Sequence, residues 1–217
     1  MAEPGLLGGR RLYLCTPDRP DLERFLAACI AGGVDLVQLR EKHLEARPLL
    51  ARAAVAAALC RDHGVPFLLN DRPDLALEAE ADGVHVGQDD APAALARRIL
   101  GPGAIVGLST HSPAQMQASR DEAVDYVSAG PVVPTPTKPG RPGTGIDYVR
   151  YAATHARRPV FITGGVTPAS VVDLVRAGGR RFVVVRWLTE GDDPEARARK
   201  LRQALDGALE ACAAQTP

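Results

Sequence analysis

The stretch of sequence that decides the fold reads Val34-Asp35-Leu36-Val37-Gln38-Leu39-Arg40-Glu41-Lys42. It is a short apolar run that ends in polar side chains, which is typical of a buried β-strand leading into a loop. Because side chains alternate along a strand, one face of this end carries Gln38, Arg40 and Lys42, and the other carries Val37, Leu39 and Glu41. The sequence therefore predicts a strand whose polar face points toward a site.

The same pattern recurs along the chain. Other apolar runs end in the tips Asn70-Asp71, Gln88-Asp89-Asp90, Ser109-Thr110, Thr135-Pro136-Thr137-Lys138 and Gly164-Gly165. The runs predict strands near residues 11–16, 34–40, 66–70, 83–86, 104–109, 125–129, 159–163 and 181–186. Longer Ala/Leu-rich segments predict helices near residues 21–32, 46–63, 73–80, 92–100, 113–121, 146–156, 168–177 and 194–213.

Eight such units predict the α/β class and, within it, a single (β/α)8 TIM barrel domain over residues 1–217. The active site is expected at the C-terminal ends of the strands, where the polar tips meet. An open, doubly wound sheet is the alternative, and it is disfavoured because no G-x-G-x-x-G motif follows the first strand. Ser112-Pro113, Thr167-Pro168 and Asp193-Pro194 are predicted helix starts.

The composition excludes several classes of protein. Lys plus Arg and Asp plus Glu both number 26, so no net positive field attracts nucleic acid or an anionic membrane. No run of about 18 apolar residues occurs, and no long apolar segment opens the chain, so we expect a cytoplasmic protein. Cys15, Cys29, Cys60 and Cys212 form no C-x-x-C pair, and we expect buried free thiols.

The polar tips predict an anion site beside a metal site. An inward row holding Arg40 and Lys42 would be costly to desolvate unless an anion completes it. Asp71 and Asp90 follow the neighbouring third and fourth strands, and Mg²⁺ is commonly held by one or two carboxylates with water and substrate phosphate. Either aspartate alone would more simply be a helix N-cap, but with the cationic row they indicate magnesium. His85 is expected to be a hydrogen-bonded core histidine and not a ligand.

A Pro- and Gly-rich segment, residues 130–145, follows the sixth strand and is unsuited to helix or strand. It carries Thr135, Thr137 and Lys138. A surface linker is the simplest interpretation. However, a long loop inside a repeating strand–helix order is often a lid over a site, and we favour the lid.

Six of these motifs together resemble the thiamine phosphate synthase family. They are Q-L-R-E-K at 38–42, N-D at 70–71, G-V-H-V-G-Q-D-D at 83–90, G-L-S at 107–109, G-P-V-V-P-T-P-T-K at 130–138 and G-G at 164–165. Their collinear order covers nearly the full chain. The resemblance implies a (β/α)8 transferase of thiamine biosynthesis that joins 4-amino-2-methyl-5-(diphosphooxymethyl)pyrimidine to a hydroxyethylthiazole phosphate, releases diphosphate and uses Mg²⁺.

The resemblance also implies roles for residues of this chain. The pyrimidine diphosphate would be bound by Gln38, Leu39, Arg40, Glu41, Lys42, Asn70, Ser109 and Lys138, with Arg40, Ser109 and Lys138 catalytic. Magnesium would be held by Asp71 and Asp90. The thiazole phosphate would be bound by Thr135, Pro136, Thr137, Gly165, Val185 and Arg186.

Arg186 departs from the family, which usually has a small residue such as Ser at the end of the eighth strand. A guanidinium matches phosphate oxygens through two N–H groups, so Arg186 could bind the thiazole phosphate in place of that residue. It could instead pair with Glu190 or with a helix end.

The residues fit the implied chemistry by themselves. Diphosphate can leave the CH₂ of an electron-rich aminopyrimidine through a cation-like transition state, so the site must mainly stabilise the departing negative charge. Two other functions stay open: a thiazole tautomerase-like isomerase, and a non-catalytic metabolite-binding barrel. The retention of Arg40, Asp71, Asp90 and Lys138 favours the synthase. Assembly into a homo-oligomer is left open.

Overall fold

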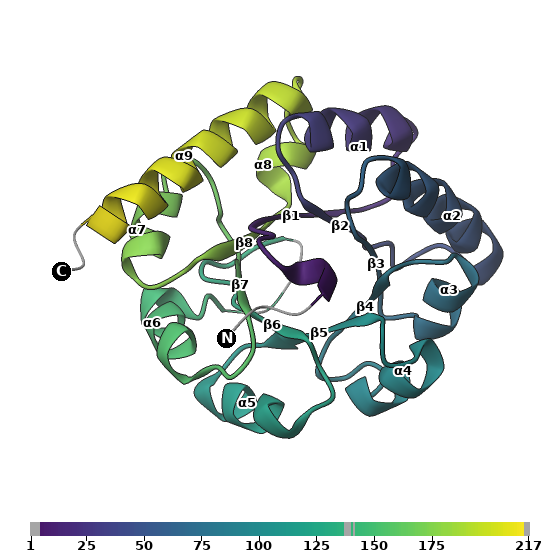
Figure 1. Ribbon diagram of the computed structural model, residues 1–217, viewed down its shortest axis with the longest axis horizontal. Coiled ribbons are helices and arrows are strands. Elements are labelled where there is room, and N and C mark those ends of the chain that lie inside the picture. Colours follow the sequence, from purple (N-terminus) through teal and green to yellow (C-terminus); the bar gives the residue numbers. More distant parts are fainter. Residues whose placement is uncertain (1–4, 137–139, 141, 215–217) are drawn as a thin grey trace.

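The structure is a computed structural model that describes residues 5–136, 140 and 142–214. Strands within these residues form a closed barrel, in which each strand runs parallel to the next and β8 pairs with β1 (Figure 1). They are β1 (Leu12–Thr16), β2 (Leu36–Leu39), β3 (Phe67–Asn70), β4 (Gly83–Val86), β5 (Ile105–Thr110), β6 (Tyr126–Ala129), β7 (Val160–Thr163) and β8 (Arg181–Val184). The predicted (β/α)8 barrel is confirmed, and the open sheet is wrong.

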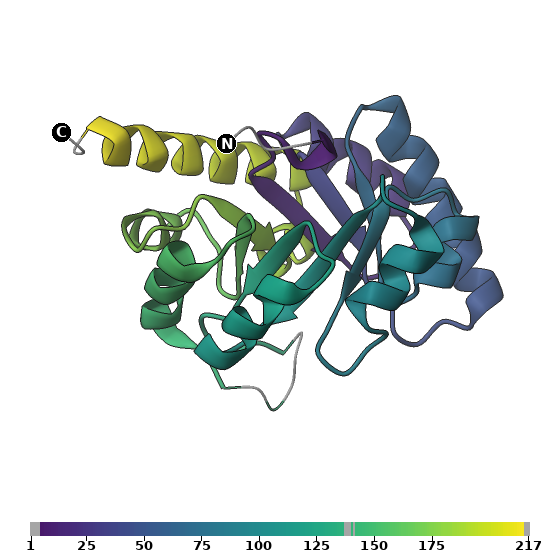
Figure 2. The same ribbon diagram turned by 60° about the horizontal axis from the view of Figure 1, so that its bottom comes forward.

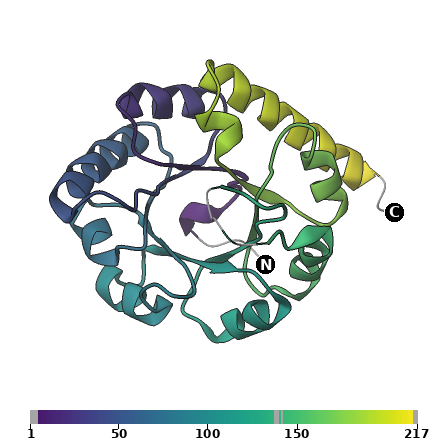
Figure 3. The ribbon, with the colours of Figure 1, turned by 180° about the vertical axis from the view of Figure 1, so that it is seen from behind.

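Helices surround the barrel on all sides, as the views from its two ends show (Figures 1 and 3). They are α1 (Leu22–Ala31), α2 (Ala46–Asp62), α3 (Pro73–Glu78), α4 (Ala93–Leu100), α5 (Pro113–Ala118), α6 (Gly145–His155), α7 (Val171–Arg176), α8 (Arg186–Thr189) and α9 (Pro194–Ala214). Two 3₁₀ turns, η1 (Gly5–Leu7) and η2 (Ser119–Asp121), complete the described elements.

The end of the eighth strand differs from the expectation. The strand stops at Val184, because the chain bends at Val185 (φ −123°, ψ −91°) into the short helix α8, which begins at Arg186. This helix was not predicted from the sequence. Arg186 therefore lies at the start of a helix and not within a strand.

Two of the three predicted helix starts are confirmed. The Ser112 hydroxyl accepts the N–H of Gln115 at 3.3 Å, and an Asp193 carboxylate oxygen accepts the N–H of Ala196 at 2.9 Å. The third is wrong: α7 begins at Val171 and not at residue 168. The Thr167 hydroxyl instead accepts the N–H of Ser170 at 3.2 Å and holds a turn ahead of the helix.

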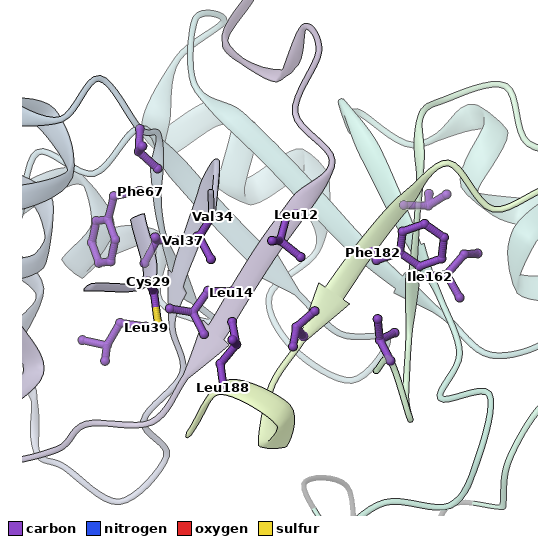
Figure 4. Close-up of a cluster of buried hydrophobic side chains, with 14 of the residues drawn as sticks. Leu12, Leu14, Cys29, Val34, Val37, Leu39, Phe67, Ile162, Phe182 and Leu188 are labelled. Atoms are coloured by element: carbon purple, nitrogen blue, oxygen red, sulfur yellow. The ribbon is translucent and has the colours of Figure 1, made fainter. Parts of the chain in front are cut away.

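Two apolar layers stabilise the barrel. The outer layer lies between strands and helices, and Figure 4 shows part of it, with Leu12 and Leu14 on β1, Phe182 on β8 and Leu188 on α8. The inner layer lies inside the barrel and consists of Leu7, Tyr13, Cys15, Leu36, Leu68, Ile105, Tyr126, Phe161 and Val183. Leu7 belongs to η1, which lies at the end of the barrel where the strands begin (Figure 2).

A polar layer lies inside the barrel beyond the apolar one. Further along the strands than the apolar positions, the inward side chains are buried and polar: Gln38, Asn70, His85, Ser109 and Ser128. This is the outcome of strict period-two alternation, since the residues between them belong to the outer layer. The barrel is therefore closed by apolar packing at one end and offers a polar floor at the other.

Gly107 shapes this interior by leaving room for a ring. A Cβ at this position would lie 2.1 Å from Cζ and 2.4 Å from the hydroxyl oxygen of Tyr126. The Tyr126 ring in turn packs edge-on against Phe161, with centroids 5.1 Å apart. Glycine at 107 is thus required by the close approach of Tyr126.

We expect Gly107→Ala to lower the free energy of unfolding by about 1–3 kcal/mol, because overpacking a close-packed interior forces side chains or backbone to shift. Urea denaturation would measure the change. Gly103→Ala is the matched control, since a Cβ at 103 meets nothing within 4 Å. Equal stability of the two variants would show that Tyr126 does not depend on the space at 107.

The four cysteines are free thiols; Cys15, Cys29 and Cys60 are buried, as predicted, and Cys212 is half-buried. Burial raises the pKa of Cys29 and of Cys60 to about 12, so both are protonated at neutral pH. In the described part of the chain, no helix has the length and apolar character needed to cross a membrane.

Candidate active site

A cavity of about 380 Å³ opens at the C-terminal ends of the strands. Its walls contain most of the site residues that the sequence predicts, namely Gln38, Arg40, Lys42, Asn70, Asp71, Asp90, Ser109, Thr135, Gly165, Val185 and Arg186. They come from seven different strand ends that are widely separated in the sequence. The closed barrel brings these polar tips together in one place.

Some predicted residues do not line the cavity. Leu39 is 1% exposed and packs in the outer layer, because it alternates with the inward Gln38 and Arg40. The Glu41 carboxylate accepts the N–H of His43 at 2.7 Å, which is a hydrogen bond within its own loop. Pro136 is described but lies outside the cavity lining. Thr137 and Lys138 lie outside the described residues, so their roles stay predictions.

An acidic corner joins the ends of β3 and β4. Lys42 Nζ lies 2.9 Å from Oδ2 of Asp71, and Oδ2 of Asp90 accepts the N–H of Gly87 at 2.8 Å. Asp71 has φ 63°, a left-handed backbone that is uncommon for a non-glycine residue and that often marks a functional position. Neither aspartate caps its following helix, since the N-cap positions belong to Arg72 and Pro92.

The two carboxyl groups of this corner affect each other's ionisation. Burial, together with a hydrogen bond to Asp90, raises the pKa of Asp71, although Lys42 opposes this. For Asp90, burial acts to raise the pKa, but the hydrogen bonds from Asp71 and from the Gly87 N–H outweigh it and lower the pKa. Two carboxylates this close cannot both ionise cheaply without a further cation, which is a setting that suits a divalent metal.

The acidic corner fits Mg²⁺ and does not form a complete protein cage. The described residues contain no group of three or more His, Cys, Asp and Glu side chains arranged for a metal. Two hard carboxylates with an open cavity in front of them match the way magnesium is bound in many sites, where water and substrate phosphate supply the other ligands.

Arg40 and Arg186 supply positive charge elsewhere in the cavity. Arg40 is half-buried and Arg186 is exposed, and neither forms an ion pair with a described residue. The backbone N–H of Glu190 bonds the backbone carbonyl of Arg186, but their side chains are not paired. A guanidinium that is not paired with any described residue is available to an anionic ligand.

Trp187, next to Arg186, is a lining residue that the sequence analysis missed. Its Nε1 donates to the carbonyl of Arg197 at 3.1 Å, and the Arg197 guanidinium lies 4.0 Å from the centre of its ring. Helix α9 thereby holds helix α8 in place beside the cavity. Trp187 was not predicted as a site residue, because the eighth strand was expected to continue to residue 186 and α8 was not expected.

Other missed residues form the cavity floor. Tyr13, Cys15 and Ser128 line the cavity together with His85. His85 accepts or donates hydrogen bonds at both ring nitrogens, 2.8 Å from the Tyr126 hydroxyl and 2.9 Å from the Ser109 hydroxyl, which confirms the predicted hydrogen-bonded histidine. The alternation of side chains along these strands could have predicted that all of them point into the barrel, since each alternates with an apolar residue of the outer layer.

The fold and the cavity together define a class of protein. A (β/α)8 barrel with cations, paired carboxylates and glycines at the C-terminal ends of its strands is typical of enzymes that act on phosphorylated small molecules, and phosphate commonly binds after strands seven and eight. The chain belongs to the thiamine monophosphate synthase family, whose sequence profile matches residues 12–188.

Individual relatives agree with this assignment. The chain is 48% identical over 207 residues to a thiamine-phosphate synthase of Mycobacterium sp. (strain KMS), covering 89% of this chain and 92% of the relative. It is 49% identical over 203 residues to a thiamine-phosphate synthase of Thermus thermophilus, covering 91% of this chain and 98% of the relative. Among solved structures, thiamine phosphate pyrophosphorylase from Pyrococcus furiosus superposes with a TM-score of 0.84 at 26% identity, covering 92% of this chain and 97% of the other.

Proposed function

We propose that the protein is a thiamine phosphate synthase, which condenses 4-amino-2-methyl-5-(diphosphooxymethyl)pyrimidine with a hydroxyethylthiazole phosphate to give thiamine phosphate and diphosphate. One observation supports this proposal in addition to the family membership. A single cavity holds the acidic corner and Arg40 on β2–β4 and, on the β7–β8 side, Gly165 and Arg186. These are two separate places for anionic groups, as a reaction between two phosphorylated substrates requires.

The pyrimidine diphosphate is assigned to the side of the cavity formed by β2–β5. Gln38 and Asn70 offer amide groups at the buried floor, while Arg40 offers charge nearer the mouth. Asp71 and Asp90 would hold Mg²⁺ against the diphosphate, and the metal would supply charge neutralisation of the leaving group. Lys42, which contacts Asp71, is close enough to share this role.

The thiazole phosphate is assigned to the loops after β6, β7 and β8. Gly164 and Gly165 have φ 93° and 75°, so the chain can turn there with its backbone close to a ligand. Thr135 adds a hydroxyl to the lining, and Arg186 adds a guanidinium. This side of the cavity thus combines small residues with a cation, which suits a phosphate monoester.

The reaction needs no nucleophilic side chain. The thiazole nitrogen forms the new bond to the CH₂ group as the C–O bond to diphosphate breaks, and the electron pair of that bond leaves with diphosphate. The protein must hold the two substrates in line and stabilise the developing negative charge. The isomerase alternative lacks support, since it gives no role to the acidic corner beside Arg40.

Trp187 offers a direct test of substrate binding, because it is the only tryptophan in the chain and it lines the cavity. Each substrate, added alone, is expected to change the tryptophan fluorescence in a saturable way. A protein that bound neither the pyrimidine diphosphate, with Mg²⁺ present, nor the thiazole phosphate would not be this synthase.

We expect Arg186→Ala to raise the KM for the thiazole phosphate about tenfold or more and to leave the KM for the pyrimidine diphosphate nearly unchanged, because one charge-assisted phosphate contact is lost. Steady-state kinetics with each substrate varied in turn would measure this. Arg157→Ala, which removes an exposed arginine away from the cavity, is the control. A change confined to the pyrimidine diphosphate, or none, would refute the role of Arg186.

A further inference from the structure

Thr163, the last residue of β7, carries its side chain on the inner face of the barrel. Phe161, two residues earlier on the same strand, belongs to the inner apolar layer, and Ile162 between them belongs to the outer layer. Because side chains alternate along a strand, the half-buried Thr163 side chain points inward, and the residue lines the cavity. It was not predicted as a site residue from the sequence.

Three neighbours of Thr163 on this wall have no polar side-chain atom. The strand register pairs Thr163 with Val183 on β8, and Val185 further along the chain packs against the same inner layer. On the side of β6, a Cβ at Gly130 would lie 2.9 Å from Cγ2 of Thr163, so the threonine methyl group faces this glycine. Thr163 therefore adds a single hydroxyl to a wall of valines and glycine.

The Thr163 hydroxyl is accessible from the cavity. It forms no hydrogen bond with a described residue, whereas the backbone carbonyl of Thr163 accepts the N–H of Val132 at 2.8 Å and holds the residue in place. Its oxygen is also not among the buried side-chain atoms of the described residues that lack a hydrogen-bond partner. The hydroxyl is thus open to a ligand and not sealed inside the protein.

A hydroxyl at this position has a cost that an apolar side chain would avoid. Valine has nearly the shape of threonine and would continue the apolar wall formed by Val183 and Val185. The threonine hydroxyl is instead partly withdrawn from water without a hydrogen bond to a described residue in return. A ligand oxygen that accepts from the hydroxyl would offset this cost.

The place of Thr163 in the barrel indicates which substrate supplies that oxygen. Thr163 directly precedes Gly164 and Gly165, on the side of the cavity assigned to the thiazole phosphate. In the order of the closed barrel, β7 lies opposite β3, so Thr163 is across the cavity from Asp71 at the end of β3 (Figure 1). The hydroxyl is therefore placed for the thiazole phosphate and not for the metal-bound diphosphate.

We propose that Thr163 is a specificity-determining residue, whose hydroxyl donates a hydrogen bond to a phosphate oxygen of the thiazole phosphate. An ionised phosphate oxygen accepts hydrogen bonds, so the threonine O–H is the donor. Arg186 attracts the same group by its charge, and Thr163 adds a directional contact from the strand. The identity of the ligand rests on the proposed function, but the accessibility of the hydroxyl does not.

Thr163→Val tests the proposal because it removes the hydroxyl and keeps the shape of the side chain. We expect the KM for the thiazole phosphate to rise about tenfold, with kcat and the KM for the pyrimidine diphosphate nearly unchanged, because a binding contact is lost. The Kd of the thiazole phosphate alone, measured by Trp187 fluorescence, should also rise about tenfold. Thr154→Val is the control, since the Thr154 hydroxyl bonds the carbonyl of Arg150 at 3.0 Å on the surface of α6.

A second pair of variants separates the hydroxyl from the methyl group. Thr163→Ser and Thr163→Ala both delete the methyl group that faces Gly130, but only the serine variant keeps a hydroxyl. The serine variant should bind the thiazole phosphate about tenfold more tightly than the alanine variant. This comparison tests the hydroxyl even if Thr163→Val does not fold.

The outcomes distinguish this proposal from the proposed function. Equal Kd values for the thiazole phosphate in Thr163→Val and the wild type, or in the serine and alanine variants, would overturn the role of Thr163. An equal rise in the KM of both substrates would also overturn it, because a general disturbance of the site would then explain the loss. The expected changes in Kd without formation of thiamine phosphate would contradict only the proposed function.

Discussion

Asp71→Asn and Asp90→Asn are each expected to lower kcat by roughly 100-fold or more without changing the stability of the fold substantially. Asparagine keeps the size of the side chain, but it removes a negative charge from the corner where the two carboxyl groups meet. Asp71 and Asp90 are the pair proposed to hold Mg²⁺ against the diphosphate, so a weaker metal site leaves the departing charge less neutralised. The rate should be measured as a function of magnesium concentration, and excess Mg²⁺ should restore part of it.

Asp74→Asn is the matched control for these two variants. Asp74 is an aspartate of α3, whose carboxylate pairs with Arg72 at 2.6 Å on the surface, and exposed ion pairs contribute little to stability. Its rate should equal that of the wild type at every magnesium concentration. Near-normal rates of Asp71→Asn and Asp90→Asn at limiting magnesium would exclude the metal assignment.

Arg40→Ala is expected to have a comparable effect, lowering kcat/KM for the pyrimidine diphosphate by roughly 100-fold. Arg40 is half-buried in the cavity wall and forms no ion pair with a described residue, so its charge is available to the substrate. A cation in a water-poor site interacts strongly with the charge that accumulates on the leaving oxygen. Arg40→Lys should recover only part of the loss, because a lysine cannot reproduce the planar, two-point contact.

The control for Arg40 is Arg47→Ala, which removes an exposed arginine of α2 that does not line the cavity. Steady-state kinetics of both variants, with the thiazole phosphate saturating, give the comparison. If Arg40→Ala and Arg47→Ala had the same small effect, Arg40 would be a solvated surface charge and the anion site would lie elsewhere.

Much of the fold and the site could be predicted because two patterns are clear in this sequence: the alternation of side chains along a strand, and the repeat of strand-like runs that end in polar residues. Strict alternation in residues 34–42 correctly placed Gln38 inside the barrel and Leu39 outside it. The placement of polar tips after successive strands predicted that Arg40, Asp71 and Asp90 share one cavity, and they do. Both results follow from local geometry, since parallel strands bring their C-terminal ends to one rim.

The features that were not predicted from the sequence depend on tertiary contacts, which override the local pattern. The eighth strand was predicted to reach residue 186, but it ends at Val184. It ends there because the next residues form α8, which contacts α9 through Trp187. Tyr126 was not singled out from the sequence, because its hydrogen-bond partners lie on β1 and β4, and no local pattern reveals them. In the same way, the pairing of Asp71 with Lys42 depends on the order of strands in the barrel.

The most direct measurement of the central claim is the formation of product from the two substrates by the purified protein. With Mg²⁺ present, the pyrimidine diphosphate and the thiazole phosphate together should yield thiamine phosphate and diphosphate in equal amounts, and omission of either substrate should abolish both products. Chelation of the metal should reduce the rate strongly. Folded protein that binds both substrates, as Trp187 fluorescence would show, but forms no thiamine phosphate with Mg²⁺ present would contradict the account.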